Sequence, residues 1–191
     1  MSFPENLTLS PIQKIFGEVI LPGSKSLSNR ILLLSMLARG KTEIQNLLDS
    51  DDIRRMVEAL ESLGIELEEN RAENRITVSG TAGIIPVSEA TLMLGNAGTA
   101  IRPLTAAMTL GHGRFVLDGV LRMRERPIID LVNGLSQLGA KLHCMNGTDC
   151  PPVEVIASGL PGGKTSLSGA ISSQFLTAIL LVAPYAKKEV Q

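Results

Sequence analysis

The stretch Asp52-Ile-Arg-Arg-Met-Val-Glu-Ala-Leu-Glu-Ser-Leu-Gly64 returns 75 residues later as Pro127-Ile-Ile-Asp-Leu-Val-Asn-Gly-Leu-Ser-Gln-Leu-Gly139. Apolar residues stand at 53, 56, 57, 60 and 63 in the first copy, and at 128, 131, 132, 135 and 138 in the second. This spacing places them on one face of a helix that ends at a glycine. We expect Ser50 to cap the first helix and Pro127 to be the first residue of the second.

Each of these helices runs into a predicted hairpin. Residues 65–68 would pair with 75–80, and residues 140–144 would pair with 153–159, because both regions alternate in polarity and contain turn residues. Linking strands are expected at residues 42–45 and 114–117. The chain therefore contains an internal repeat, so its two copies are expected to fold alike.

The start of the repeat is a short strand, a loop of small residues and an apolar helix. Strands are predicted at Glu18–Leu21, Thr91–Leu94 and Thr165–Leu167, and the helices after them at residues up to Arg39, Leu110 and Ala183. The pattern predicts an α/β fold of βαβαββ units, with mixed sheets packed around helices. The units span about residues 18–80, 90–160 and 164–191, and the third is truncated.

Composition narrows the function. Hydrophobic residues make up 44% of the 191 residues, and 18 basic against 19 acidic side chains leave a net charge of −1. A nearly neutral chain has no positive electrostatic field that would attract nucleic acid or an anionic membrane. Cys144 and Cys150 are too few for a disulfide framework or a zinc site, so free thiols are expected. The longest apolar run is too short for a membrane span, and we expect a soluble cytoplasmic protein without metal or cofactor.

Three loops stand where the helices of the repeat begin, and a helix start holds anions. The loop of residues 21–30 carries Lys25, Ser26 and Arg30. The loop of residues 94–104 contains two glycines with small neighbours. The loop of residues 168–175 offers hydroxyl and amide groups without charge. Each loop, taken alone, is also compatible with an ordinary capped helix start. If the units pack with pseudo-threefold symmetry, the three starts meet on one side.

A fourth segment, Arg122-Met-Arg-Glu-Arg-Pro-Ile128, places three arginines before a helix. Arginine binds carboxylate and phosphate through two parallel hydrogen bonds, although an exposed basic loop would look the same. His112 and His143 have no partner ligands or nucleophile nearby in the sequence.

Together these segments closely resemble the EPSP synthase family of enolpyruvyl transferases. The matching motifs are Leu-Pro-Gly-Ser-Lys-Ser (21–26) with Asn29-Arg30, Asn-Leu-Leu-Asp-Ser-Asp-Asp (46–52), Leu-Gly-Asn-Ala-Gly-Thr-Ala (94–100) with Arg102-Pro103, Arg-Met-Arg-Glu-Arg-Pro (122–127) and Ser-Ser-Gln-Phe-Leu (172–176). The resemblance implies an inside-out α/β barrel domain that transfers the enolpyruvyl group of phosphoenolpyruvate to shikimate 3-phosphate.

The resemblance also implies roles for single residues. Lys25, Ser26 and Arg30 would hold shikimate 3-phosphate, with Lys25 also reaching phosphoenolpyruvate. Ser172, Ser173 and Gln174 would hold the ring of that substrate, and Gly98 and Arg126 would line the phosphoenolpyruvate site. With Thr99 and Pro103, Gly98 resembles the class of the family that glyphosate inhibits.

One part of the family pattern is absent from these 191 residues. The family's second domain carries an aspartate base and further Lys, Arg and Glu groups, and residues 1–20 normally associate with it. We therefore expect residues 21–191 to be the substrate-binding domain, inactive without that second domain.

The sister family, UDP-N-acetylglucosamine enolpyruvyl transferase, carries a reactive cysteine that residues 118–125 lack. A non-catalytic module that binds a phosphorylated metabolite is the alternative from another class. A purely structural repeat protein would leave the basic residues at the small-residue loops unexplained.

Overall fold

The computed structural model describes residues 6–168 and 172–191, which contain five α-helices and seven strands. The helices are α1 (Lys25–Leu37), α2 (Asp51–Ser62), α3 (Gly98–Met108), α4 (Ile129–Gln137) and α5 (Ser173–Val182). The strands are β1 (Arg39–Gln45), β2 (Leu67–Asn70), β3 (Arg75–Thr81), β4 (Glu89–Met93), β5 (His112–Asp118), β6 (Lys141–Cys144) and β7 (Val153–Ser158).

The strands form two sheets, one for each complete repeat unit. The first has the order β1-β3-β2 and is antiparallel throughout. The second has the order β4-β5-β7-β6, in which β4 and β5 are parallel and the other pairs antiparallel. Both predicted hairpins, β2–β3 and β6–β7, are present. The expectation of an α/β fold with a mixed sheet is confirmed.

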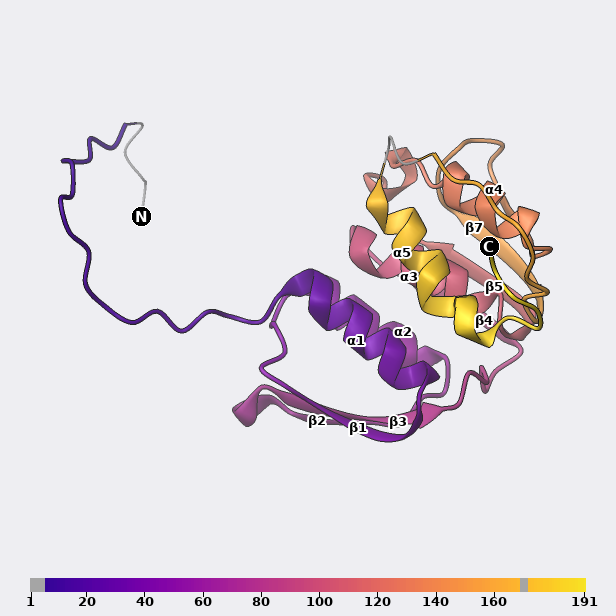
Figure 1. The fold of residues 1–191 in the computed structure, drawn as a ribbon, viewed down its shortest axis with the longest axis horizontal. Helices are drawn as coiled ribbons and strands as arrows, with labels where there is room; N and C mark the ends of the chain where they lie inside the picture. The colour runs from indigo at the N-terminus through magenta and orange to yellow at the C-terminus, as the bar shows by residue number, and fades with distance from the viewer. Residues whose placement is uncertain (1–5, 169–171) are drawn as a thin grey trace.

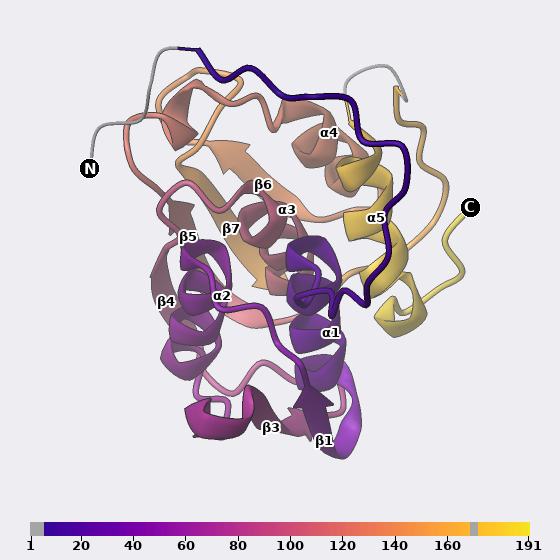
Figure 2. The same cartoon turned by 90° about the vertical axis from the view of Figure 1, so that its left-hand side faces the viewer.

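The sheets lie outside and the helices lie between them. In Figure 1, α1 and α2 cover the three-stranded sheet, while α3, α4 and α5 lie with the four-stranded sheet. Figure 2 shows α3 near the centre of the body, and α3 contacts the other four helices as well as β5 and β7. Ten of its eleven residues are buried, as expected for a helix with neighbours on every side.

The core is aliphatic, because the chain is 3% aromatic and has no tryptophan. Leucine, isoleucine, valine and methionine fill the space between the sheets and α3, joined by the fully buried Phe115 and Phe175. Along β7 the side chains of Val153, Val155 and Ala157 alternate inward, which fits a sheet with one covered face.

Two predicted strands are wrong. Residues 18–21 form no strand but belong to an extended segment, residues 6–24, that leaves the body, as Figure 1 shows. Val19, Ile20 and Leu21 are at least 74% exposed there, and no described strand pairs with them. Residues 165–167 also form no strand, because the pairing in this region is limited to one bridge between Gly163 and Val190. A strand needs a neighbour, which local pattern cannot supply.

Two helix boundaries and one helix cap also differ from the prediction. α4 begins at Ile129 rather than at Pro127, since the carbonyl of Asp149 accepts the N–H groups of both Ile128 and Ile129. α1 ends at Leu37, because Arg39 and Gly40 pair with β3. Ser50 precedes α2, but its hydroxyl makes no capping bond and is buried without a hydrogen-bond partner.

Cys144 and Cys150 are free thiols, as expected. Burial raises the pKa of Cys144 to about 11, with further contributions from Cys150 and Asp149. At neutral pH this thiol is therefore protonated and a poor nucleophile. None of the helices in the described residues is long and apolar enough to cross a membrane.

The central position of α3 gives a test of the packing. Leu104→Ala should lower the free energy of unfolding by about 2–5 kcal/mol, because Leu104 is fully buried and truncation leaves a cavity. The matched control is Leu180→Ala on α5, where the side chain is 60% exposed and the change should stay within about 0.5 kcal/mol. Urea denaturation measures both, and equal losses would contradict this assignment of the core.

Candidate functional site

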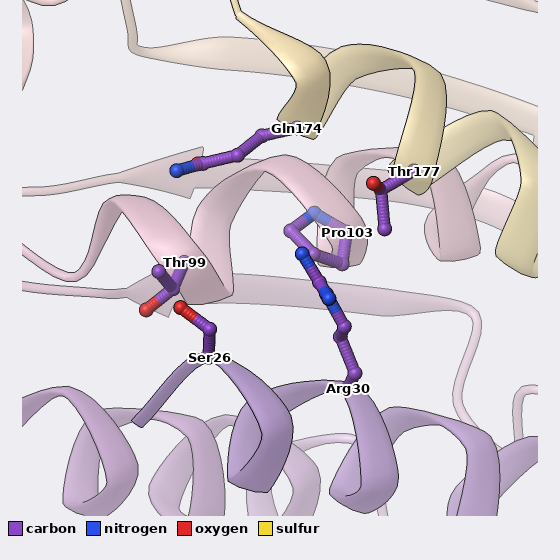
Figure 3. Close-up of a pocket in the computed structure, with 6 residues that line it drawn as sticks. All are labelled: Ser26, Arg30, Thr99, Pro103, Gln174 and Thr177. Atoms are coloured by element: carbon purple, nitrogen blue, oxygen red, sulfur yellow. The ribbon is translucent and has the colours of Figure 1, made fainter. Parts of the chain in front are cut away.

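The first two turns of α1, α3 and α5 meet at one pocket. It is lined by Ser26 and Arg30 from α1, Thr99 and Pro103 from α3, and Gln174 and Thr177 from α5. Figure 3 shows these six side chains around a common space, a small cavity of about 20 Å³ that is open to solvent. The three predicted loops, 70 or more residues apart in sequence, therefore converge as the repeat implied.

The first loop approaches the chain that precedes α2. A Cβ at Gly23 would overlap the carbonyl oxygen of Asn46, so glycine is required there for steric reasons. Ser24 caps α1, its Oγ accepting from the N–H of Leu27 at 3.4 Å. Lys25 follows as the first residue of the helix, and its ammonium group lies 3.4 Å from Asp52 Oδ2.

Asp52 links this lysine to the second loop. Thr99 Oγ1 donates to Asp52 Oδ2 at 3.0 Å and accepts from Asn29 Nδ2 at 2.7 Å. Asn29 is fully buried, and its Oδ1 has no hydrogen-bond partner among the described residues. This chain of contacts fixes α1, α2 and α3 relative to one another at the edge of the pocket.

Gly98, the first residue of α3, lies directly under Arg126. A Cβ at Gly98 would overlap the guanidinium group of Arg126, so the absence of a side chain makes room for the arginine. Arg126 Nη1 donates to the backbone oxygen of Asn96 at 3.0 Å and to its Oδ1 at 3.2 Å. The two residues assigned to one subsite by resemblance are thus in contact.

The third loop is described from Ser172 onward, and its residues 169–171 lie outside the described range. Ser172 caps α5, its Oγ accepting from the backbone N–H of Gln174 at 3.2 Å. Ser173 is exposed at the first position of the helix. Gln174 Oε1 accepts from Arg102 Nη1 at 2.6 Å.

The three arginines of the segment before α4 have different partners. Arg122 pairs with Glu125, and Arg124 forms a two-point contact with Asp118. Burial alone would raise the pKa of Asp118, but the hydrogen bonds from Arg124 and from the Gly119 N–H lower it below its ordinary value. Within the described residues, only Arg126 of these three forms no ion pair with a carboxylate.

The site carries an excess of positive charge. Arg30 lines the pocket, Lys25 precedes the pocket residue Ser26, and Arg102 bonds to the pocket residue Gln174. Arg126 contacts Gly98, next to Thr99, and Asp52 pairs with Lys25. In the part of the chain that the structure describes, Arg30 makes no hydrogen bond or ion pair. Such an arrangement attracts an anion, and the helix starts add their N–H groups and partial positive charge.

Three residues of this site were not predicted as binding residues, although all stand in the motifs. Asp52, Thr99 and Arg102 act through partners on other helices, so the sequence gives little sign of their contacts. The one available signal is the spacing from Gly98 to Arg102, four residues on a helix, which places both on one face.

A larger cavity, about 230 Å³, lies beside α2 and is lined by none of the predicted site residues. Its arginines, Arg54 and Arg75, are both paired with carboxylates. It therefore lacks the unpaired cations that mark the pocket of the three helix starts.

Fold and site together define a mixed α/β domain of repeated units with a cationic pocket at gathered helix N-termini. The sequence profile of EPSP synthase (3-phosphoshikimate 1-carboxyvinyltransferase) matches residues 9–191. The chain belongs to this family.

Individual relatives support the assignment to this family. The chloroplastic 3-phosphoshikimate 1-carboxyvinyltransferase of Petunia hybrida is 57% identical over 196 residues, covering 98% of this chain and 38% of the relative. The enzyme of the same name from Shewanella denitrificans is 54% identical, covering 97% and 44%. A solved EPSP synthase from Acinetobacter baumannii superimposes with a TM-score of 0.81 at 26% identity, covering 91% of this chain and 39% of that one. The chain thus spans about two fifths of these relatives.

The contact between Thr99, Asn29 and Asp52 leads to a stability prediction. Thr99→Val keeps the shape but removes the hydroxyl, leaving Asn29 Nδ2 buried without an acceptor. We expect the free energy of unfolding to fall by about 1–3 kcal/mol. Thr177→Val is the control, since the Thr177 hydroxyl bonds only to the Ser173 carbonyl of its own helix. Thermal denaturation that ranks the two variants equally would contradict the linking role of Thr99.

The contact between Gly98 and Arg126 is tested by a double-mutant cycle. In an Arg126→Ala background, Gly98→Ala should be neutral or stabilising by up to about 1 kcal/mol, because alanine favours helix over glycine. With Arg126 present, the new methyl must displace the guanidinium from Asn96, so the benefit should shrink or reverse. Urea denaturation of the four proteins gives the coupling, and additive effects would show that the two residues do not contact each other.

Proposed function

We propose that this chain supplies the shikimate 3-phosphate half-site of a 3-phosphoshikimate 1-carboxyvinyltransferase. The reaction moves the enolpyruvyl group of phosphoenolpyruvate to the 5-hydroxyl oxygen of shikimate 3-phosphate and releases inorganic phosphate. Its place is in aromatic amino acid biosynthesis through the shikimate pathway. The cytoplasmic location expected from composition remains a prediction.

One observation carries the proposal. Ser26, Arg30 and Gln174, three of the residues assigned to shikimate 3-phosphate by resemblance, line a single pocket although they come from two distant helix starts. Thr99 joins them from a third. A pocket that combines an unpaired guanidinium with hydroxyl and amide groups suits a phosphorylated polyol better than a simple anion.

The proposed roles follow the charges. Lys25, Ser26 and Arg30 hold shikimate 3-phosphate, and Lys25 also reaches phosphoenolpyruvate. Ser172, Ser173 and Gln174 contact the ring, and Gly98 with Arg126 lines the phosphoenolpyruvate subsite. Two polyanions must lie side by side for the transfer, and unpaired cations offset their mutual repulsion. Glyphosate is proposed as an inhibitor, because Gly98, Thr99 and Pro103 match the sensitive class of the family.

The remaining chemistry is proposed to come from groups outside this chain. Protonation of the enol carbon creates an oxocarbenium-like centre and needs an acid, and the family's aspartate base has no counterpart in these 191 residues. The cavity, about 20 Å³, is also far below the roughly 300–1,000 Å³ of typical ligand sites. Both points support a half-site that a further domain completes.

Calorimetry with the purified chain tests the proposal. Shikimate 3-phosphate should bind and shikimate, which lacks the phosphate, should bind far more weakly. Arg30→Gln should lower the affinity for shikimate 3-phosphate by about tenfold or more, since it removes a charge-assisted contact. Arg39→Gln removes the same charge at an exposed position of β1 and should leave the affinity unchanged.

Failure to bind shikimate 3-phosphate, or equal effects of the two arginine variants, would refute the half-site. Turnover should be undetectable when both substrates are supplied to this chain alone. If product formed, the assignment of the acid–base groups to another domain would be wrong.

A further inference from the structure

Arg102 is a buried cation that contacts Gln174, one of the residues that line the pocket. It is 9% exposed and lies on α3, one turn after Gly98. No carboxylate of residues 6–168 and 172–191 forms an ion pair with it. Burial lowers the pKa of Arg102 below its ordinary value, and the nearby Arg126 lowers it further. A buried charge without an ionic partner is unfavourable for stability, so its contacts merit a functional explanation.

Two consecutive residues of α5 contact this guanidinium. Gln174 Oε1 accepts a hydrogen bond from Nη1 at 2.6 Å, and the ring centroid of Phe175 lies 5.3 Å from the guanidinium carbon. Phe175 is 1% exposed, so the ring offers its π face inside the core. This cation–π contact and the charged hydrogen bond partly replace the lost water.

The hydrogen bond from Arg102 fixes the orientation of the Gln174 side-chain amide. A side-chain amide has one acceptor end, the oxygen, and one donor end, the NH2 group. Arg102 occupies the oxygen, and Ser172 Oγ holds the backbone N–H of the same residue. In Figure 3 the amide nitrogen is the outermost atom of the Gln174 side chain and lies on the Thr99 side of the view, and Gln174 is one of the residues that line the pocket.

We propose that Arg102 is a positioning residue that orients the Gln174 amide so that its NH2 group faces the ligand. Arg102 itself need not touch the substrate. Gln174 then acts as a fixed donor, and the ligand must present an oxygen acceptor at this point, such as a hydroxyl, carboxylate or phosphate oxygen. The identity of that ligand as shikimate 3-phosphate rests on the proposed function above, but the orientation of the amide does not.

Three substitutions separate orientation from stability. Arg102→Lys keeps the charge but loses the planar fork, and Arg102→Met loses both while keeping much of the stem. Gln174→Glu keeps an oxygen for Arg102, with which it would form an ion pair, but replaces the donor NH2 by an acceptor. Gln13→Glu adds the same charge in the exposed N-terminal segment and is the matched control.

The first measurement needs no ligand. In a ¹⁵N–¹H spectrum of the free chain, the two resonances of the Gln174 side-chain NH2 should be shifted away from those of exposed glutamines, because Arg102 fixes the amide. In Arg102→Met these should collapse toward the position of exposed glutamines while the backbone spectrum stays folded. Unchanged Gln174 resonances in a folded Arg102→Met chain would overturn the proposal.

The second measurement is the affinity for shikimate 3-phosphate by calorimetry. Gln174→Glu should keep the thermal stability but bind at least about tenfold more weakly, and Arg102→Met should lose a similar factor, with Arg102→Lys between it and the unchanged chain. Should Arg102→Met fail to fold, Gln174→Glu decides, and an affinity equal to that of Gln13→Glu would overturn the proposal. If the unchanged chain binds no shikimate 3-phosphate, the proposed function fails while the spectra still test the orientation.

Discussion

The burial of α3 on every side is the constraint on which the rest of this structure depends. A helix enclosed by four others and two strands needs small residues where its neighbours come close, and Gly98, Ala100, Ala106 and Ala107 provide them. Because α1 and α5 both pack on α3, their first turns lie beside its own. The pocket is thus a product of helix packing, and its position follows from the repeat rather than from any single loop.

The arginines near the pocket differ from those elsewhere in whether they are paired with carboxylates. Away from the pocket, arginines such as Arg54, Arg114 and Arg124 are paired with carboxylates. At the pocket Arg30, Arg102 and Arg126 are not, within the described residues. Two unit charges 4 Å apart interact by about 4 kcal/mol at an effective dielectric constant of 20. Cations left unpaired in this way favour an anionic ligand strongly, although the chain as a whole is nearly neutral.

Most of the architecture could be predicted from periodicity. The amphipathic faces of α2 and α4 and the alternation in both hairpins are local signals, and they indicated the repeat. The errors lie where a distant group decides: the Asp149 carbonyl sets the start of α4, and residues 18–21 lack a partner strand. In the site, the motif residues that face the pocket were predictable. The role of Arg102 was not, because its partner Gln174 lies 72 residues further on.

The overlap between the missing Cβ of Gly98 and the guanidinium of Arg126 has an evolutionary meaning. A side chain gained at position 98 meets the guanidinium group of Arg126, so the effect of a change at one position depends on the residue at the other. The guanidinium is the end of a flexible side chain and can move aside, so the order in which the two positions change alters the cost of each step.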